Sequence, residues 1–399
     1  MVEGEILMKV DACPLCEAVN CEVFLQRVQV PVHQNLLASS PSEARNSKRG
    51  DLAISLCTRC GFVFNAAFRQ DFMSYCQGYD SAQAYSPLFR KYLKGIADDL
   101  VERYRLVGQT VVEVGCGKGD FLQLLCAEGR NRGIGFDPSY VGPETTGGGI
   151  VHFISEPFGG QHAGLAPALL CCRHVIEHIP NPLQMLGEIR KALGEGSNAI
   201  VYFETPDVEW ILENVAFWDF FYEHCSYFGP DTLKLAFEKA GFSVLSVRHV
   251  FGAQYLAVEA RATAPREFLP LPSASDVRGL RKGVASFRHN TLRKIDECRN
   301  QVRDMAHNGG CALWGAAAKG VTFANVIDPD VAEIKCVVDV SPAKAGRFVP
   351  GTGHPIVSLE ALGRHYSVAG LLSMNPNYLQ EQRAMLSALA LPITVEALR

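Results

Sequence analysis

Between residues 110 and about 260, short runs of β-branched and other apolar residues alternate with stretches of helical periodicity. This alternation is typical of a doubly wound α/β sheet, in which helices cross both faces of a mostly parallel sheet. No helical stretch separates the last two apolar runs, so we expect them to form an antiparallel pair at one edge. The strands that this pattern predicts are 111–114, 133–136, 168–172, 199–203, 244–249 and 255–259.

The segments on either side of this sheet have different patterns. Residues 1–70 are expected to form short strands and turns around two cysteine pairs, and residues 71–105 a helical lead-in. A proline-rich joint and a long amphipathic helix follow, with Ser275 as the expected N-cap and Gly309-Gly310 as the end. The rest of the chain repeats strand–turn–helix steps. We therefore predict a small N-terminal domain (1–70), the main α/β domain (71–262), a linker with a long helix (263–310) and a C-terminal α/β, Rossmann-like domain (311–399).

Composition narrows the class of protein. The 399 residues are 48% hydrophobic and 20% charged with a net charge of −4, and Lys and Arg are scattered, which argues against a nucleic-acid partner. No uncharged apolar run reaches the roughly 18 residues that a membrane span needs. The acidic start, Met1-Val-Glu-Gly-Glu, lacks the basic flank and apolar run of a secretory signal. We expect a cytoplasmic protein whose fourteen cysteines are reduced, so that paired cysteines indicate metal before disulfides.

Two such pairs lie in the N-terminal segment. Cys13-Pro-Leu-Cys16 and Cys57-Thr-Arg-Cys60 are both C-x2-C turns, and each turn supplies two thiolates from one tight loop. Four thiolates complete a tetrahedral zinc site and leave no open position for water or substrate. The four cysteines Cys13, Cys16, Cys57 and Cys60 therefore predict structural zinc, the alternative being two incidental turns of buried cysteine.

The sharpest motif is a glycine-rich loop between the first strand and the next helix. It contains Gly115, Gly117 and Gly119, and glycine lets the backbone approach a ligand in conformations that a Cβ forbids. The helix that starts here offers free N–H groups to a carboxylate. The second strand ends at Asp137, where an acid can accept both hydroxyls of a ribose. A turn made only for tight packing is the alternative.

Such a loop fits a dinucleotide or S-adenosylmethionine, and two details favour the second. Glu113 lies on the strand just before the loop, and the spacing is Gly-x-Gly-x-Gly rather than Gly-x-Gly-x-x-Gly. The pattern resembles the first motif of class I methyltransferases. We therefore expect an S-adenosylmethionine site that includes Glu113, Gly115, Cys116, Gly117, Gly119, Asp120 and Asp137.

The fourth strand runs into a segment with two histidines. The carboxyl ends of the first, second and fourth strands of such a sheet meet at the cofactor crevice. His174 and His178 are four residues apart, so on a helical turn both can face the same side. The segment looks like the one that follows strand four in small-molecule methyltransferases, and we expect His174 to contact the cofactor. The alternative is a capped helix with one solvent-facing histidine.

An aromatic-rich stretch over 217–228 contains the adjacent pair Glu223 and His224. Methylation of carbon requires a base next to an acidified C–H and hydrogen-bond donors for the developing enolate oxygen. His224 has a pKa suited to this base, Glu223 can orient it, and Tyr222 or Tyr227 can donate to the oxygen. The alternative is an aromatic lid that only packs.

Three blocks of the chain together resemble one family, the three-domain sugar C-methyltransferases, which methylate carbon 3 of nucleotide-linked 4-keto-6-deoxysugars. The first block holds the two cysteine pairs and Gly61-Phe-Val, and the second is Tyr222-Glu-His-Cys-Ser-Tyr-Phe228. The third joins Leu313-Trp-Gly-Ala-Ala-Ala-Lys-Gly320 to Val337-Val-Asp-Val-Ser-Pro-Ala-Lys-Ala-Gly-Arg-Phe-Val-Pro-Gly351. The resemblance covers nearly the whole chain.

The resemblance implies roles for particular residues. It makes His224 the general base and places His178 in the site, and it gives the C-terminal domain a share in binding the sugar nucleotide. There Gly315 and Lys319, at a strand–helix turn, are the expected phosphate or nucleotide contacts; close packing is the alternative. The family usually carries Tyr-His-Glu-His where this chain has Phe221-Tyr-Glu-His, so another tyrosine, such as Tyr79, must supply the missing hydroxyl.

We therefore expect an S-adenosylmethionine-dependent C-methyltransferase with structural zinc, acting on carbon alpha to a ketone of a small polar substrate as a monomer or homodimer. Three other functions fit parts of the pattern. An O- or N-methyltransferase would use the same cofactor loop. An NAD(P)-binding oxidoreductase would use glycine-rich turns such as those at Gly115 and Gly315. A zinc-bearing binding module would have no catalytic residue.

Overall fold

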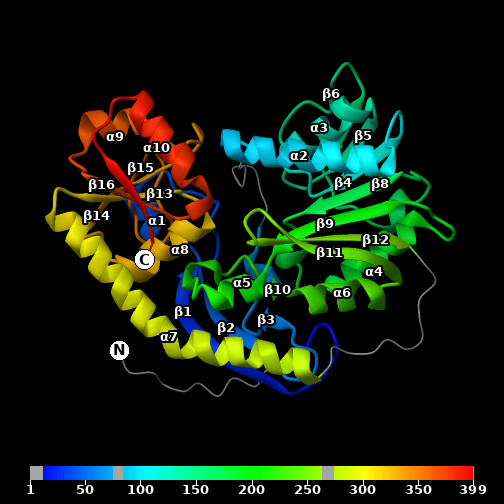
Figure 1. Cartoon of the computed structure of the whole chain (residues 1–399), viewed down its shortest axis with the longest axis horizontal. Coiled ribbons are helices and arrows are strands. Elements are labelled where there is room, and N and C mark those ends of the chain that lie inside the picture. Colours follow the sequence, from blue (N-terminus) through cyan, green and yellow to red (C-terminus); the bar gives the residue numbers. More distant parts are fainter. Residues whose placement is uncertain (1–11, 75–83, 263–273, 399) are drawn as a thin grey trace.

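The computed structural model of the chain describes residues 12–74, 84–262 and 274–398. These segments form three β-sheets with helices packed around them (Figure 1). The eight-stranded sheet lies on the right of the view, the five-stranded C-terminal sheet on the left, and the four-stranded N-terminal sheet below both. Within the described ranges, no helix is both long enough and apolar enough to cross a membrane.

The N-terminal sheet is antiparallel and has the order β1-β2-β3-β10. Its last strand comes from the middle of the chain: β10 pairs Ser226 with Phe64 and Tyr227 with Val63. The sheet is therefore completed by the segment that directly follows the Glu223-His224 pair. Its elements are β1 (Cys21–Pro31), α1 (Pro41–Arg45), β2 (Arg49–Cys57), β3 (Val63–Asn65), η1 (Gln70–Phe72) and β10 (Ser226–Tyr227).

The central sheet has the order β11-β12-β9-β8-β4-β5-β7-β6. Its inner strands β9, β8, β4, β5 and β7 are parallel, and β11 and β12 form the expected antiparallel pair at one edge. The predicted α/β sheet is confirmed, but β7 was missed, because a four-residue run that contains a histidine carries little pattern. The strands are β4 (Thr110–Val114), β5 (Arg132–Phe136), β6 (Thr145–Thr146), β7 (Val151–Ile154), β8 (Leu169–Arg173), β9 (Ile200–Pro206), β11 (Phe242–Val250) and β12 (Tyr255–Ala262).

Helices cover both faces of this sheet. Apolar side chains of α2 and α3 bury one face, and those of α4 and α6 bury the other together with Leu15 and Phe62 of the cysteine-rich segment. The N-terminal segment therefore shares a hydrophobic core with the central sheet. The helices are α2 (Pro87–Tyr104), α3 (Asp120–Gly129), η2 (Gly160–His162), η3 (Ile176–His178), α4 (Pro182–Leu193), α5 (Val208–Glu213), η4 (Phe217–Asp219) and α6 (Pro230–Lys239).

The long helix α7 (Ala274–His307) runs along the N-terminal sheet to the C-terminal sheet (Figure 1). It buries Phe287 and Val302 as its amphipathic pattern predicts, whereas Leu292 is 68% exposed and does not belong to the buried face. The all-parallel sheet that follows has the order β15-β14-β13-β16-β17. Its elements are β13 (Cys311–Trp314), α8 (Ala318–Ile327), β14 (Ile334–Val338), β15 (Ile356–Val357), α9 (Leu359–His365), β16 (Gly370–Ser373), η5 (Pro376–Tyr378), α10 (Leu379–Ala388) and β17 (Thr394–Ala397).

The parallel strands of the central sheet and those of the C-terminal sheet reverse their order beside the first strand. Ligands of such folds bind at that point, outside the carboxyl ends of the strands. In the central sheet this point lies between β4 and β8, and in the C-terminal sheet between β13 and β16. The two crevices open into one cavity.

Candidate functional site

The cavity has a volume of about 1140 Å³ and is lined by residues of all three sheets and their loops. The central sheet contributes the glycine-rich loop and both predicted histidines, the C-terminal sheet the turn at Gly315, and the N-terminal region Asn35. The structure therefore brings together most of the residues that the sequence singled out. Those that line the cavity are Glu113, Gly115, Cys116, Gly117, Asp120, Asp137, His174, His178, Glu223, His224, Gly315 and Lys319.

The three glycines of the loop serve different purposes. Gly115 (φ 69°) and Gly119 (φ 80°) lie in the left-handed region, and a Cβ on them would be 2.2 Å from Val175 Cγ2 and 2.4 Å from the ring of Phe153. Both positions are explained by close packing, and Gly119 does not line the cavity. Gly117 (φ 55°) also lines the cavity, but a Cβ there would meet no atom of the described residues within 4 Å. Packing therefore does not explain Gly117, whose backbone faces open space of the kind a ligand requires.

The carboxylate of Asp137 is fixed at the end of β5. Its Oδ2 accepts a hydrogen bond from the Gly117 N–H (2.8 Å), and its Oδ1 accepts from the N–H and hydroxyl of Ser139 (2.8 and 2.7 Å). Next to it, Gly119 is the N-cap of α3 and has no side chain to cap the helix start. An ordered acceptor and a helix start without a side-chain cap thus lie side by side.

Glu113 and Asp120 bracket the loop. Glu113 is buried on β4 and accepts the Leu122 N–H with Oε2 (3.1 Å), and burial raises the pKa of its carboxyl to about 8. Asp120 is the first residue of α3, and burial raises its pKa as well. Cys116, buried between them in the loop, also lines the cavity. Glu113 therefore ties the strand to the start of the helix from inside the fold.

A buried ion pair that the sequence analysis missed supports this side of the cavity. Arg173 Nη2 lies 2.8 Å from Glu204 Oε2, and the guanidinium lies 4.7 Å from the ring centre of Phe121. Burial alone would raise the pKa of Glu204, but Arg173 and His174 hold it at about 2. Arg173 directly precedes a predicted site residue, yet nothing in the sequence pairs it with a carboxylate on β9.

His174 and His178 both line the cavity, but the helical turn predicted to carry them is wrong in one respect. The turn η3 starts only at Ile176, and His174 precedes it with φ 54°. The His174 ring lies 4.5 Å from that of Tyr255, with Nδ1 3.4 Å from Glu177 Oε1 and Nε2 3.6 Å from Glu204 Oε2. Burial opposes protonation of this ring, but the two carboxylates raise its pKa above the usual value.

His178 and His224 are neighbours because their backbone segments are joined. The Cys225 N–H donates to the Glu177 carbonyl (2.9 Å), and the Ser226 hydroxyl donates to the Ile179 carbonyl (2.7 Å). The two imidazole rings lie 4.7 Å apart at 83°. His178 Nδ1 lies 3.0 Å from the Glu223 carbonyl oxygen, and since a carbonyl only accepts, this nitrogen is the donor and Nε2 carries the lone pair.

His224 is 9% exposed, and its Nδ1 has no hydrogen-bond partner in the part of the chain that the structure describes. Its ring centre lies 4.0 Å from that of Phe221, and the two rings are tilted by 42°. Burial, followed by the neighbouring His178, His174 and Lys319, holds the pKa of this imidazole well below its usual value. His224 is therefore a neutral imidazole at neutral pH, in contact with the cavity.

The side chain of Glu223 is bound by the N-terminal region, which corrects its predicted role of orienting His224. Its Oε1 accepts the Gln34 N–H (3.0 Å) and lies 3.6 Å from His33 Nδ1, and its Oε2 accepts from Asn35 Nδ2 (3.3 Å). Through its backbone carbonyl it orients His178 instead. No motif or spacing in Val32-His-Gln-Asn35 indicates this contact.

Tyr222 is not a substrate donor, contrary to one option from the sequence. Its hydroxyl accepts the Arg69 N–H (2.9 Å) and its ring packs against Phe68, so it lies in the core rather than the cavity. Tyr227, the other option, donates to the Phe221 carbonyl (3.3 Å). Tyr79 lies outside the described residues. Three other tyrosines line the cavity in the described ranges: Tyr85, Tyr255 and Tyr378.

Lys319 reaches the cavity from the second residue of α8. Its Nζ lies 3.1 Å from Asp219 Oδ2 and 3.3 Å from Gln254 Oε1, and 5.3 Å from the ring centre of Trp210. Burial raises the pKa of Asp219, and Lys319 opposes that rise. The lysine thus joins the C-terminal domain to η4 across the cavity.

The turn at Gly315 closes around an aspartate that the sequence analysis did not single out. Asp339, at the end of β14, accepts the Ala316 N–H with Oδ2 (2.8 Å), and Lys344 Nζ lies 3.4 Å from the same oxygen. Gly315 has φ 120°, a conformation that favours glycine. Asp339, Lys344 and Arg347 line the cavity beside it, so this crevice carries more positive charge than the first.

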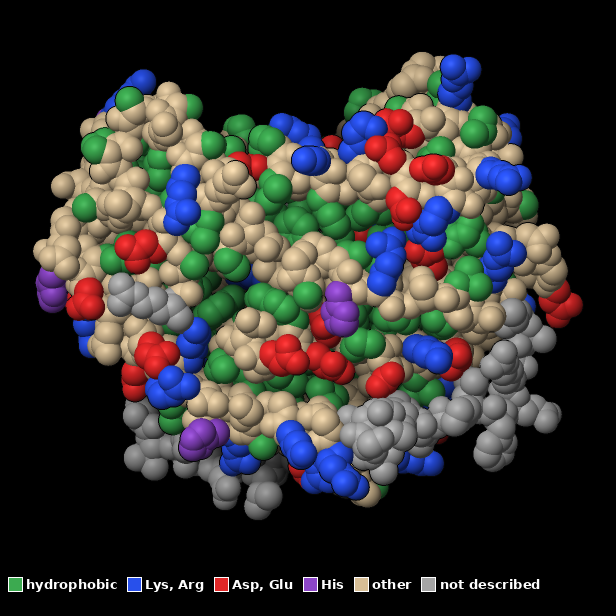
Figure 2. All heavy atoms as spheres, in the orientation of Figure 1, with side chains coloured by type: hydrophobic (Ala, Val, Ile, Leu, Met, Phe, Trp, Pro, Cys, Tyr) green, Lys and Arg blue, Asp and Glu red, His purple; other side chains and the backbone are tan. Residues whose placement is uncertain are grey.

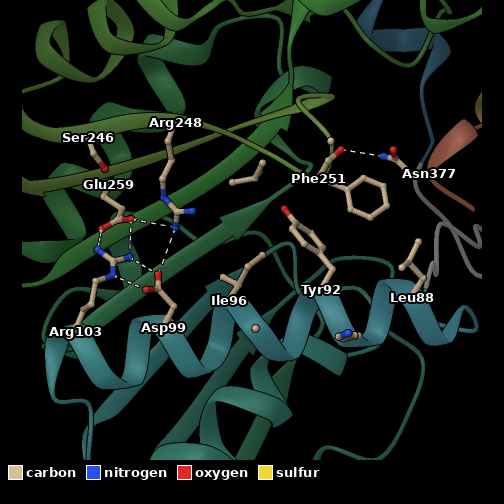
Figure 3. Close-up of a pocket in the computed structure, with 14 residues that line it drawn as sticks. Leu88, Tyr92, Ile96, Asp99, Arg103, Ser246, Arg248, Phe251, Glu259 and Asn377 are labelled. Atoms are coloured by element: carbon tan, nitrogen blue, oxygen red, sulfur yellow. Dashed lines mark hydrogen bonds and ion pairs between the residues drawn. The ribbon is translucent and has the colours of Figure 1, made fainter.

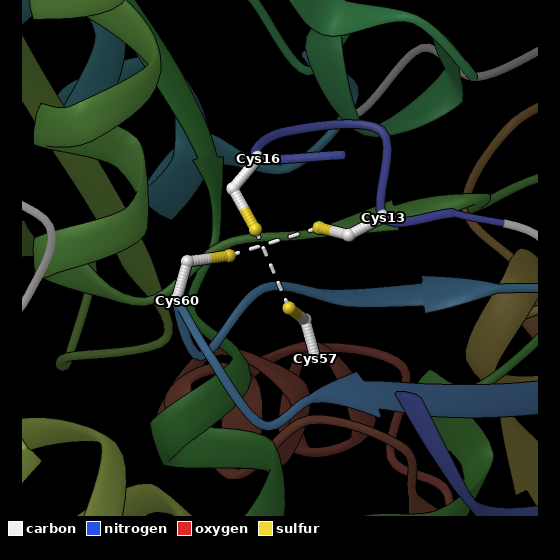
Figure 4. A group of neighbouring side chains, drawn as sticks. All are labelled: Cys13, Cys16, Cys57 and Cys60. Carbon is white, nitrogen blue, oxygen red and sulfur yellow. Dashed lines mark hydrogen bonds between the residues drawn. The ribbon is translucent and has the colours of Figure 1, made fainter. Parts of the chain in front are cut away.

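The four predicted zinc ligands lie together (Figure 4). Cys13 Sγ is 3.7 Å from Cys60 Sγ, and Cys16 Sγ is 3.5 Å from Cys57 Sγ. Four thiolates at the usual Zn–S length of about 2.3 Å are about 3.8 Å apart in a tetrahedron. All four are buried, and hydrogen bonds from Cys13 and Cys60 hold the pKa of the Cys57 thiol well below its usual value. The donor set fits a structural zinc ion.

A second hollow lies between α2 and the β11–β12 pair, where hydrophobic side chains gather on the surface (Figure 2). It has a volume of about 980 Å³. At one end Arg103 and Arg248 bind Glu259 and Asp99 (Figure 3), with Arg103 Nη1 2.7 Å from Glu259 Oε2. The four charged side chains at this end are therefore paired with one another.

Comparison with known proteins agrees with this geometry. Residues 89–247 match a methyltransferase domain, and residues 269–380 match the C-methyltransferase C-terminal domain. The chain is similar to the C-methyltransferase NovU of Streptomyces niveus, with 27% identity over 380 residues that cover 90% of this chain and 89% of that protein.

Solved methyltransferase structures also resemble part of the chain. Magnesium protoporphyrin IX methyltransferase from Synechocystis PCC 6803, with bound SAH, is 14% identical, with 44% of this chain and 84% of that chain covered and a TM-score of 0.35. The 1,6-didemethyltoxoflavin-N1-methyltransferase of Burkholderia thailandensis is 15% identical, with 46% and 91% covered and a TM-score of 0.34.

The two family matches follow one another along the chain, and the similarity to NovU extends over both of them. The central sheet has the topology and the glycine-rich loop that S-adenosylmethionine requires. The chain is therefore an S-adenosylmethionine-dependent methyltransferase whose C-terminal part matches the C-methyltransferase C-terminal domain.

Proposed function

We propose that this enzyme methylates a carbon alpha to the ketone of a nucleotide-linked keto-deoxysugar. The observation that carries the proposal is the position of His224. Its buried imidazole, with an unpartnered Nδ1, faces a cavity into which a cofactor crevice and a second, positively charged crevice both open. A base in this position suits a substrate that is bound in the second crevice and receives its methyl group from a cofactor in the first.

The first crevice holds the cofactor in this proposal. Bound S-adenosylmethionine supplies an electrophilic methyl group. Asp137 would accept hydroxyls of its ribose, Gly117 would let the loop backbone approach it, and the N–H groups at the start of α3 would bind its carboxylate. Asp120, at the first residue of α3, adds a negative charge that suits the ammonium group. Glu113 acts indirectly, by fixing Leu122 and with it the helix start.

C-methylation requires a base that removes the alpha proton, and the His224 imidazole can act as this base. A C–H next to a ketone is acidic enough for an imidazole to remove its proton, provided that the enolate oxygen is stabilised. His224 would take the proton, and His178 lies beside it with a lone pair on Nε2. The hydroxyl missing at Phe221 would come from Tyr255 or Tyr378 among the described residues, since both line the cavity. The aromatic ring of Phe221 holds the base in position.

The second crevice suits the nucleotide. Lys319, Lys344 and Arg347 line it, and cations of this kind bind phosphate oxygens. Gly315 and Ala316 follow β13 at the point where the strand order reverses, and their small size lets a ligand approach the backbone there. Similarity to a C-methyltransferase over both matched domains supports this division of the cavity between cofactor and substrate.

The test is a screen of keto-sugar nucleotides with S-adenosylmethionine, in which mass spectrometry detects the gain of one methyl group. A product whose new methyl group is on carbon, as NMR determines, is the expected result. Exchange of the alpha proton for deuterium without the cofactor should occur in the wild-type enzyme and be lost in His224→Ala. The exposed His289→Ala serves as the matched control and should exchange normally. A methyl group found on oxygen or nitrogen would replace this proposal with an O- or N-methyltransferase.

A further inference from the structure

Three metal-binding side chains lie together in the cavity, apart from the four-cysteine site. One ligand atom each of Glu177, His178 and His224 lie within 4.8 Å of one another. Ligand atoms around one transition-metal ion, at bonds of roughly 2.0 to 2.2 Å, are about 3 to 4 Å apart. Small side-chain rotations therefore suffice to bring the three donors onto a common ion.

The surroundings of the donor atoms differ between the three side chains. Among the described residues, His224 Nδ1 and Glu177 Oε1 are both buried without a hydrogen-bond partner, although Oε1 lies 3.4 Å from His174 Nδ1. His178 donates through Nδ1 to the Glu223 carbonyl, which fixes its lone pair on Nε2. A backbone carbonyl behind a ligating histidine is the usual arrangement at metal sites, since it sets the tautomer of the ring.

The surroundings also suit an ion. Glu177 is 2% exposed and is held by the Thr205 hydroxyl, which donates to its other oxygen, Oε2 (3.2 Å). All three side chains line the cavity, so water or substrate can complete the coordination sphere on the open side. Two imidazoles and one carboxylate are donors that Zn²⁺, Co²⁺ and Ni²⁺ accept.

We propose that Glu177, His178 and His224 form a binding site for a divalent transition-metal ion of the Zn²⁺ class, and that its occupation switches methyl transfer off. The inhibition rests on the proposed role of His224. A neutral imidazole has one lone pair, so a ring bound to metal cannot accept a proton from carbon. The cofactor loop is not part of the site, so metal should leave S-adenosylmethionine binding unchanged.

The experiment adds Co²⁺ to the full-length enzyme after its four-cysteine site has been saturated with zinc. One further equivalent of Co²⁺ should bind, with visible absorption of nitrogen and oxygen ligation and without strong thiolate charge-transfer bands. Zn²⁺ should displace it, and methyl transfer should fall in proportion to the site's occupation. Calorimetry should give the same affinity for S-adenosylmethionine with and without Co²⁺.

Two variants remove a ligand in different ways. Glu177→Gln and His178→Gln should each weaken Co²⁺ binding at least about tenfold, as loss of a supporting group alone already does at many metal sites. The matched control is Glu156→Gln, which alters a His–Glu pair on the surface, His162 Nε2 to Glu156 Oε1 at 2.8 Å, and should bind Co²⁺ like the wild type. Thermal unfolding checks that each variant is folded.

Equal Co²⁺ affinity in the wild type and in a folded ligand variant overturns the site. Full methyl transfer by the Co²⁺-loaded enzyme overturns the inhibition. If the screen of keto-sugar nucleotides finds no substrate, the Co²⁺ titrations still decide whether the site exists, because they measure binding without turnover.

Discussion

The two crevices of the cavity share one backbone arrangement. In the first, Asp137 accepts the N–H of Gly117 at 2.8 Å, and in the second, Asp339 accepts the N–H of Ala316 at 2.8 Å. Each aspartate also accepts the N–H of the serine two residues further on, at 2.8 and 2.9 Å. In both, the first strand is followed by a glycine with positive φ and then by a helix.

The crevices differ in charge. The helix of the first crevice begins with Asp120, whereas Lys319 is the second residue of the helix in the second. Lys344 lies against Asp339, while the N–H and hydroxyl of Ser139 are bound to Asp137. The same backbone arrangement therefore carries opposite charges at the two helix starts. In the function that we propose, the acidic helix start suits a cationic cofactor and the basic one an anionic substrate.

The largest effect on the rate of methyl transfer is expected from substitution of His224. His224→Ala should lower the rate of methyl transfer by about 10²- to 10⁴-fold, the range for a general base, with little change in S-adenosylmethionine affinity. Stopped-flow rates and calorimetry measure the two quantities. His289→Ala is the surface control. If the folded His224→Ala variant transferred methyl groups at an unchanged rate, His224 would not be the general base.

A reciprocal pair of variants tests whether the crevices hold different ligands. Asp137→Ala should weaken S-adenosylmethionine binding by roughly tenfold to a hundredfold, because a hydrogen bond to a charged group contributes about 1.5 to 3 kcal/mol. Asp339→Ala should leave that affinity unchanged and raise the KM of the nucleotide substrate. If both variants lose affinity for the same ligand, the division of the cavity is wrong.

The charges at the helix starts give a smaller effect. Lys319→Gln should raise the KM of the sugar nucleotide by about tenfold, since it removes a cation from the second crevice. Asp120→Asn should instead weaken S-adenosylmethionine binding by a few fold, in the range of charges near a helix terminus. Swapped outcomes, measured by steady-state kinetics and calorimetry, would reverse the assignment of the crevices.

A further prediction concerns stability rather than binding, through the support of the first crevice. Burial raises the pKa of Glu113 from 4.5 to about 8, so the folded state binds more protons than the unfolded state between these values, and stability is lost as the pH rises through them. Glu113→Gln keeps an acceptor for Leu122 without this loss. Its melting temperature relative to wild type should therefore rise with pH, by about 2 to 4 °C per kcal/mol. The exposed Glu195→Gln should show no such trend.

The sequence predicts those features whose cause is local. The strand–glycine–helix pattern places Gly115 and Asp137 at the same edge because parallel strands end together. The cause is also local in the two C-x2-C turns, because each tight turn fixes the spacing of its two thiols. The family resemblance added His178 and the C-terminal turn at Gly315.

The features that the sequence did not reveal depend on contacts between distant segments. Glu223 stands beside the base in the chain, but its carboxylate is bound by Gln34 and Asn35, nearly two hundred positions earlier. Tyr222 faces the core, where it contacts Phe68 and the Arg69 N–H, more than one hundred and fifty positions earlier. The pairing of Arg173 with Glu204 joins two strands whose order only the fold determines. Contacts between such distant segments leave no motif of fixed spacing in the sequence.

The strand pairing between β10 and β3 has a practical consequence. Ser226, two residues beyond His224, is bonded into the sheet that begins in the cysteine-rich segment. A chain shortened to start after residue 70 would retain the glycine-rich loop but lose the partner strand that sets the backbone of its histidine. Exchanging N-terminal segments between relatives would accordingly alter catalysis itself, so this segment is not an accessory that can be transplanted independently.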